Sequence, residues 1–187
     1  MNGLSTEVFD KRWRDLCTVT EAGAEQLRGM VKEHYLGKWP AIQTCRLAMY
    51  CGPFVVGMCL FSEPPKETNI RYGGKTWELA RLWIRDDIPR NAESWLIAQA
   101  VKHIRRTYPE VRFLVSYADP SAGHTGIVYR AANWTADGRT DDDRKSPRCD
   151  YVGINSGRKF SRSGRNGHED VIRVPRVSKY RYIYRMR

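Results

Sequence analysis

The sequence contains no apolar run near the roughly 18 residues that a membrane-spanning helix requires. Residues 1–12 are polar and charged, without the apolar core of a signal peptide. The five cysteines are an odd number, and no two of them have the CxxC spacing. These absences argue against a membrane protein, a disulfide framework and a zinc knuckle. We therefore expect a cytoplasmic protein whose thiols are reduced.

The chain also lacks internal repeats, heptads and a carboxylate cluster with the spacing of a two-metal nuclease. Its length of 187 residues, with 41% hydrophobic residues, is enough to bury one sizeable core. We expect a single domain over 1–187. The oligomeric state stays open, a homodimer included.

Positive charge is abundant and unevenly placed. The net charge is +11, and residues 144–187 hold 13 Lys/Arg against 3 Asp/Glu, whereas the remainder holds 19 against 18. A concentrated basic segment with interleaved aromatics is typical of a polyanion partner, although a solubilising tail is the alternative. The sequence predicts DNA contacts from six basic residues: Arg158, Lys159, Arg162, Arg165, Lys179 and Arg181.

Hydrophobic periodicity predicts an α/β fold in which helices flank a central mixed, twisted sheet. The consecutive β–α–β elements imply at least two parallel strands. Residues 136–178 are basic and polar, so we expect a loop-rich insertion there. The expected elements are helices at 21–35, 91–107 and 123–133, and strands at 45–51, 54–61, 75–84, 111–117 and about 179–185.

This order of elements resembles the GNAT acyltransferase fold. Members commonly carry a Tyr in the helix after the fifth strand, with Gly-Phe four and five residues later. Here Tyr129 takes the Tyr position and Asn133-Trp134 replaces Gly-Phe; Asn suits a helix end because it tolerates positive φ. The resemblance implies that the Tyr129 hydroxyl protonates the leaving group.

The segment that should bind the donor departs from the GNAT pattern. Members open the preceding helix with a glycine-rich loop that cradles the coenzyme A pyrophosphate. Residues 90–95, RNAESW, contain no glycine. Arg90, Asn91 and Ser94 could still bind a phosphate at this helix start, but Glu93 would oppose it, and Trp95 would obstruct it.

A dense polar segment follows the strand at 111–117. Ser116, Asp119 and His124 supply a hydroxyl, a base and a switchable acid–base group. The segment begins at the carboxyl end of an expected parallel strand, where ligands bind in open α/β sheets. A plain turn at Asp119-Pro120 is the alternative.

Taken together, several segments resemble the Mom family of Mu-like phage DNA-modification proteins. The resemblance implies conversion of adenine in DNA to N6-carbamoylmethyladenine, which protects phage DNA from restriction. It implies functional positions at His34, Tyr35, Ser116, Asp119 and Tyr129. An iron requirement is associated with the family; His34, Tyr35, Asp119 and Tyr129 offer hard ligands, but not in a metal motif. The resemblance rests on His34-Tyr35, 78–82, 89–94, 116–120, 123–133 and 180–182.

The adenine amine lies inside the duplex, so we expect a flipped base or a single-stranded substrate. Asp119 would accept the amine proton. Because carbamoylmethyl and glycyl groups are isomers, one route is glycyl transfer followed by rearrangement. The donor is left between acetyl-CoA and glycyl-tRNA, the latter because of the missing glycine loop and the basic segment. Alternatives are a non-catalytic nucleic-acid-binding protein and a protein or small-amine N-acetyltransferase.

Overall fold

A computed structural model describes residues 12–142, 144–146, 148–160 and 170–187. Its centre is a seven-stranded sheet in the order β1-β2-β3-β4-β5-β10-β6, in which only β4 and β5 run parallel. The strands are β1 (Cys17–Glu21), β2 (Gln43–Cys51), β3 (Phe54–Ser62), β4 (Thr76–Ile84), β5 (Phe113–Ala118), β6 (Thr135–Arg139) and β10 (Tyr180–Arg185). The expected mixed sheet, the hairpin and the closing strand are confirmed.

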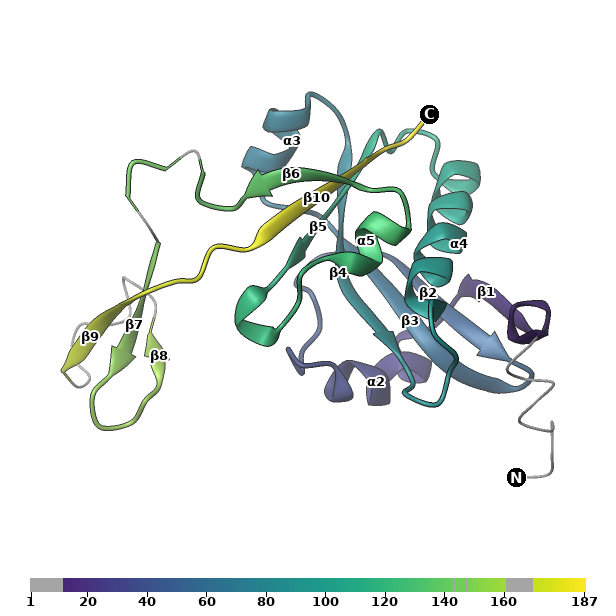
Figure 1. Ribbon diagram of the computed structural model, residues 1–187, viewed down its shortest axis with the longest axis horizontal. Helices are drawn as coiled ribbons and strands as arrows, with labels where there is room; N and C mark the ends of the chain where they lie inside the picture. The colour runs from purple at the N-terminus through teal and green to yellow at the C-terminus, as the bar shows by residue number, and fades with distance from the viewer. Residues whose placement is uncertain (1–11, 143, 147, 161–169) are drawn as a thin grey trace.

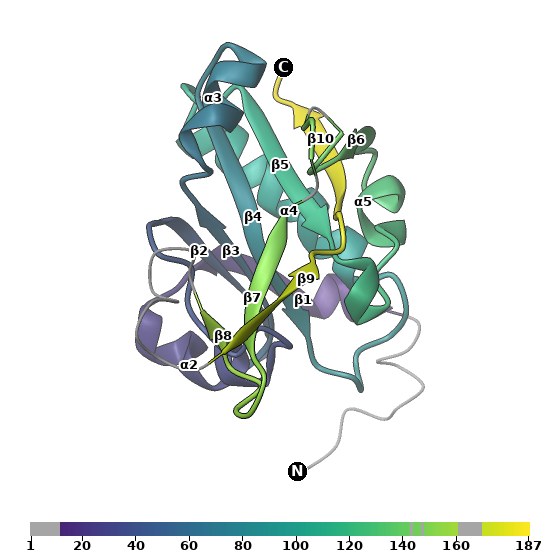
Figure 2. The same cartoon turned by 90° about the vertical axis from the view of Figure 1, so that its left-hand side faces the viewer.

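Helices cover both faces of this sheet (Figures 1 and 2). On one face α2 packs Leu27 and Val31 against Ala48, Met58 and Leu60. On the other face α4 buries residues at helical spacing, including Leu96, Ile97, Ala100 and Ile104, within the larger core cluster. The helical elements are α2 (Ala24–Glu33), α3 (Lys66–Tyr72), α4 (Ala92–Thr107), the 3-10 helix η1 (Pro120–Ala122) and α5 (Ile127–Ala131).

The sequence predicted a loop-rich insertion at residues 136–178. The structure instead has four short strands in this region. β6 joins the edge of the large sheet, and β7 (Cys149–Gly153), β8 (Lys159–Phe160) and β9 (Val171–Pro175) form a separate sheet in the order β8-β7-β9. This small sheet projects from the core at the left of Figure 1. β1 and α3 were also not predicted. No helix in the described part of the chain is long and apolar enough to cross a membrane.

The parallel pairing between β4 and β5 is short. Its last paired residues are Glu78 and Val115, although both strands continue beyond them. Past this point the two strands are no longer paired. In open α/β sheets, ligands bind beyond the carboxyl ends of parallel strands, where neighbouring strands separate. The functional side chains described below surround this separation.

Two glycines set the path into α5, and they provide a matched pair for a stability test. Gly123 and Gly126 both have φ of 76°. A Cβ on Gly126 would lie 2.1 Å from Tyr182 Cε2, whereas a Cβ on Gly123 would meet nothing within 4 Å. We predict that Gly123→Ala lowers the free energy of unfolding by about 1 kcal/mol through backbone strain. Gly126→Ala should cost about 1–3 kcal/mol more through overpacking. Equal losses in chemical denaturation would contradict the predicted clash.

Candidate active site

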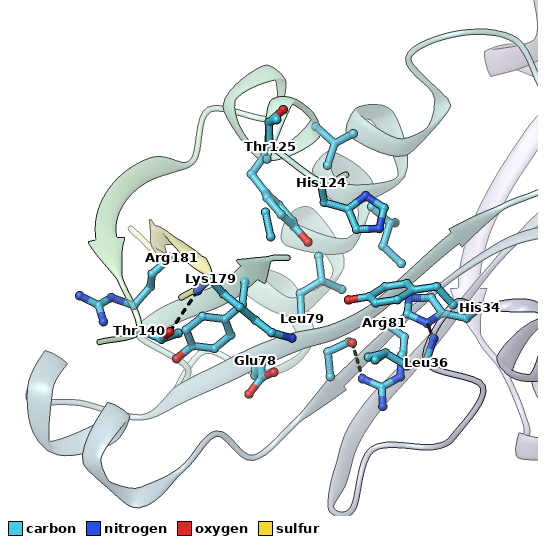
Figure 3. A pocket seen from close by; sticks show the side chains of 18 of the residues that line it. His34, Leu36, Glu78, Leu79, Arg81, His124, Thr125, Thr140, Lys179 and Arg181 are labelled. Atoms are coloured by element: carbon cyan, nitrogen blue, oxygen red, sulfur yellow. Dashed lines mark hydrogen bonds between the residues drawn. The ribbon is translucent and has the colours of Figure 1, made fainter. Parts of the chain in front are cut away.

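A cavity of about 980 Å³ opens where β4 and β5 separate. Its lining comes from β4, the end of α2, the segment from Gly123 to Tyr129, and the connections that flank the small sheet. Figure 3 shows His34, His124 and Arg81 on one side of the cavity, and Glu78, Lys179 and Arg181 on the other. The cavity thus brings together residues that are far apart in the sequence.

Tyr129 sits in α5, which begins after Gly126, and it is 9% exposed. Its hydroxyl lies 2.8 Å from Ser116 Oγ, which lies 2.8 Å from the Leu79 carbonyl oxygen. Since that carbonyl can only accept, Ser116 donates to it and the Tyr129 hydroxyl donates to Ser116. Burial raises the pKa of Tyr129 to about 12, so the phenol stays protonated at neutral pH. Asn133 has φ of 62° as α5 ends, which suits an Asn at this position.

Three aromatic rings line one wall. The ring centroids of His34 and Tyr35 are 4.5 Å apart, and those of Tyr35 and His124 are 5.0 Å apart. His34 is 8% exposed, whereas Tyr35 is 50% exposed. Tyr35 is therefore half-exposed at the cavity wall, whereas His34 is buried against it.

Asp119 lies beside the cavity but is already engaged. Its carboxylate accepts from the Ser121 backbone N–H at 3.0 Å and pairs with Lys179 Nζ at 2.9 Å. Burial would raise its pKa, but the hydrogen bonds from Ser121 and Lys179 outweigh burial, and the pKa is lowered. Asp119 is thus a stable anion that holds Lys179 at the cavity wall.

Glu78 is a cavity residue that the sequence analysis did not single out. It is the last β4 residue paired with β5, and no described residue forms a hydrogen bond or ion pair with its side chain. Burial raises its pKa, and the charges of Arg81 and Lys179 only partly offset this. A carboxylate within a mostly apolar strand was the available sequence signal.

Cations of the C-terminal quarter form the outer wall of the cavity. These cations belong to the segment between β6 and β7, to the segment between β9 and β10, and to β10 itself. None of the cations that line the cavity lies in β7, β8 or β9. Several are paired with aspartates, including Arg148 with Asp141 at 2.6 Å and Arg181 with Asp137 at 2.8 Å. The lining cations from these segments and β10 are Arg144, Arg148, Arg176, Lys179 and Arg181.

The structure does not bring all the predicted site residues together. Arg90 and Asn91 are exposed at the start of α4, and Ser94 Oγ donates to the Asn91 carbonyl at 3.1 Å, away from the cavity lining. On the small sheet, Lys159 pairs with Asp150, and the Arg158 guanidinium lies over the Phe160 ring. Arg162 and Arg165 lie outside the described residues.

The comparison with protein families decides the identity. A model of the Mom protein family matches residues 16–187. The chain belongs to the Mom family. A curated relative, methylcarbamoylase mom of Escherichia phage Mu, is 33% identical over 107 residues, which is 57% of this chain. The match spans 38% of that relative's length.

Solved structures show that this Mom-family chain has the GNAT acyltransferase fold, as expected. A Bacillus subtilis acetyltransferase in complex with CoA has a TM-score of 0.54 at 10% identity, covering 90% of this chain and 97% of the other. A GNAT family acetyltransferase from Elizabethkingia anophelis with acetyl-CoA bound has a TM-score of 0.50 at 10% identity, covering 91% and 99%. The Mom-like residues are therefore carried on a GNAT scaffold.

The buried position of His34 predicts a defined pH dependence of stability. Burial, followed by the charges of Arg81 and His124, lowers its pKa from 6.5 to about 4. The neutral Nδ1 accepts from the Leu36 N–H at 3.2 Å. The unfolded chain therefore takes up a proton below pH 6.5 that the folded protein refuses until about pH 4. From this group alone, the free energy of unfolding should fall by about 1–3 kcal/mol between those pH values.

Comparison with His34→Gln isolates this contribution, because the variant cannot titrate at this position. The difference in unfolding free energy between wild type and variant should shrink as the pH falls from 6.5 to 4. Parallel pH profiles for the two proteins would contradict the assigned environment of His34.

Proposed function

We propose that this protein modifies phage DNA, converting adenine to N6-carbamoylmethyladenine in the host cytoplasm and so protecting the DNA from restriction. Membership of the Mom family and the 33% identical methylcarbamoylase of phage Mu support the proposal. One structural observation carries it. The Tyr129 hydroxyl, hydrogen-bonded to Ser116, faces a cavity with a cationic outer wall at the separation of β4 and β5.

Tyr129 is the proposed general acid. With a pKa of about 12 it is protonated at neutral pH and can donate to a developing anion on the leaving group. Ser116 is the proposed positioning residue. When the phenol loses its proton, the Ser116 hydroxyl can turn from the Leu79 carbonyl to the phenolate oxygen, since both lie 2.8 Å from Oγ.

Two carboxylates are candidates to accept the amine proton. Asp119 is committed to Lys179 and Ser121, which lowers its pKa and weakens it as a base. Glu78 lines the cavity and has a raised pKa, which brings it closer to the working range of a general base. We infer that Glu78 accepts the proton and that Asp119 fixes Lys179.

The substrate base would enter the cavity after flipping out of the duplex. Tyr35 offers a half-exposed ring between His34 and His124 on which adenine can stack. The arginines of the outer wall, with Arg158 and Lys159 of the small sheet and the predicted Arg162 and Arg165, would contact the phosphates.

We infer that the donor is an acyl donor held at the separated strands. Two fold neighbours support an acyl donor, because one is in complex with CoA and the other has acetyl-CoA bound. The start of α4 fits a pyrophosphate poorly, because Glu93 of its first turn lines the cavity and no glycine allows close approach. The cationic wall accommodates a larger anionic donor, which keeps glycyl-tRNA beside acetyl-CoA as a candidate. For an iron ion, three of the predicted donors, His34, Tyr35 and Tyr129, line the cavity. Within the described residues, neither His34 nor the fourth predicted donor, Asp119, belongs to a close cluster of His, Cys, Asp and Glu ligand atoms.

A glycyl donor explains the product without an oxidant. The acyl carbon first joins the adenine N6, and the leaving group takes the proton of Tyr129. The glycyl amine then attacks the ring C6 through a five-membered intermediate, and the bond from C6 to the original nitrogen breaks. That nitrogen becomes the terminal amide. Labelling N6 with heavy nitrogen and fragmenting the product nucleoside tests this route, because label retained on the ring-attached nitrogen excludes it.

Loss of the Tyr129 hydroxyl should abolish modification without loss of the fold. In Tyr129→Phe the ring still packs against Trp134 and Tyr182, and Ser116 still donates to the Leu79 carbonyl. We predict a drop in rate of about 10²-fold or more, measured by mass spectrometry of nucleosides from DNA of expressing cells. Modification at the wild-type level would contradict the acid role. Unmodified adenine with well-expressed wild type would favour a nucleic-acid-binding protein or an acetyltransferase of another amine.

The two carboxylates are separated by matched amide variants. Glu78→Gln should slow modification by about 10²-fold. The pH profile of the remaining rate should no longer show the titration of the Glu78 carboxyl. Asp119→Asn should weaken substrate binding more than the rate at saturation, because it releases Lys179. The readouts are kcat and KM on an oligonucleotide substrate, together with the pH profile of the rate. The reverse pattern would make Asp119 the base.

A further inference from the structure

Three side chains of different chemistry converge outside the reaction cavity. Glu21 ends β1, Cys45 lies in β2 and His103 lies in α4. Their ligand atoms all lie within 4.8 Å of one another, and none of the three lines the cavity. A carboxylate oxygen, a thiol sulfur and an imidazole nitrogen are the donor types that transition metals use in proteins.

We propose that Glu21, Cys45 and His103 form a binding site for a divalent transition metal, for which Zn²⁺ is the best match. Zn²⁺ accepts mixed O, S and N ligands and tolerates three protein ligands with water in the fourth position. The Cys45 side is buried, at 5% exposure, whereas the Glu21 side chain is 48% exposed. An ion can therefore reach the cluster from the Glu21 side, where the fourth position meets solvent.

Hydrogen bonds already orient the carboxylate and the imidazole. Glu21 Oε1 lies 2.9 Å from His103 Nε2 and accepts from the Tyr108 hydroxyl at 2.8 Å. An ion would replace the hydrogen bond between Glu21 and His103, with the imidazole proton moving to Nδ1 so that Nε2 can coordinate. The Tyr108 hydroxyl would remain on the carboxylate as an outer-shell partner.

Metal binding would require loss of the Cys45 thiol proton, because the thiolate is the form that coordinates a metal. A divalent ion would form a bond to sulfur, release the thiol proton to solvent and balance the charges of thiolate and carboxylate. Affinity should therefore rise with pH.

The site would fasten three elements at one edge of the large sheet. β1 is the edge strand and β2 is its neighbour. α4 packs on the face of the sheet that carries the larger core cluster. Because the three ligands come together only in the folded chain, the ion should raise the temperature of thermal unfolding. The expected contribution is structural and independent of DNA.

Cobalt substitution tests the site directly. The full chain is freed of metal with a chelator and titrated with Co²⁺ and then Zn²⁺, without DNA or donor. We expect one Co²⁺ per chain, a near-ultraviolet absorption band from the cobalt–thiolate bond, displacement by Zn²⁺ and a raised unfolding temperature. Cys45→Ser should abolish the band, and Tyr108→Phe should weaken binding by about tenfold.

Two variants serve as matched controls. Cys17→Ser removes another buried thiol, which belongs to no such cluster in the described ranges, and should keep the band. His34→Gln should also keep it, which separates the site from an ion held in the reaction cavity. Glu21→Gln changes a half-exposed group and should weaken binding even if Cys45→Ser folds poorly.

Absence of cobalt binding by the wild type would overturn the proposal. So would a band that survives Cys45→Ser, cobalt binding of wild-type strength in Glu21→Gln, or a band that disappears in His34→Gln. None of these readouts depends on DNA modification, so the result is independent of the proposed function.

Discussion

The end of the parallel pairing between β4 and β5 is the constraint on which the site depends. After Glu78 and Val115 the two strands no longer share a ladder. One residue further along β4, the Leu79 carbonyl accepts from the Ser116 side chain of β5. The same hydroxyl lies against Tyr129, so the contact that satisfies an interior carbonyl also places the proposed acid. One chain of hydrogen bonds therefore links the backbone of β4 to the proposed acid through Ser116.

Much of the central architecture could be predicted because its signals are local. The spacing of Ile97, Val101 and Ile104 indicated α4, and the apolar runs around Gly52 indicated the hairpin of β2 and β3. β6 was missed because its residues are mostly polar, and β7 and β9 because their side chains are half-exposed or exposed rather than alternately buried. Such strands are specified by their pairing partners rather than by hydrophobic alternation.

Several residues that meet at the cavity could be named from the sequence, but the pairing of their side chains could not. The segment pattern identified Tyr129 and Ser116, and the structure places their oxygens 2.8 Å apart. It could not reveal that Asp119 is held by Lys179, a residue 60 positions away, because such pairing depends on β10 lying beside β5. Nor could it reveal that Glu78 lines the cavity, where burial raises its pKa.

Part of the basic C-terminal quarter lines the cavity, through Arg144, Arg148, Arg176, Lys179 and Arg181. Asp119, Asp137 and Asp141 precede it in the chain and bind Lys179, Arg181 and Arg148. These pairs fix the cations along the cavity wall, whereas the positive excess of the segment remains to attract phosphates. Partly buried pairs are screened less by salt than exposed charges. Salt should therefore weaken the encounter with DNA before it loosens the wall that receives the base.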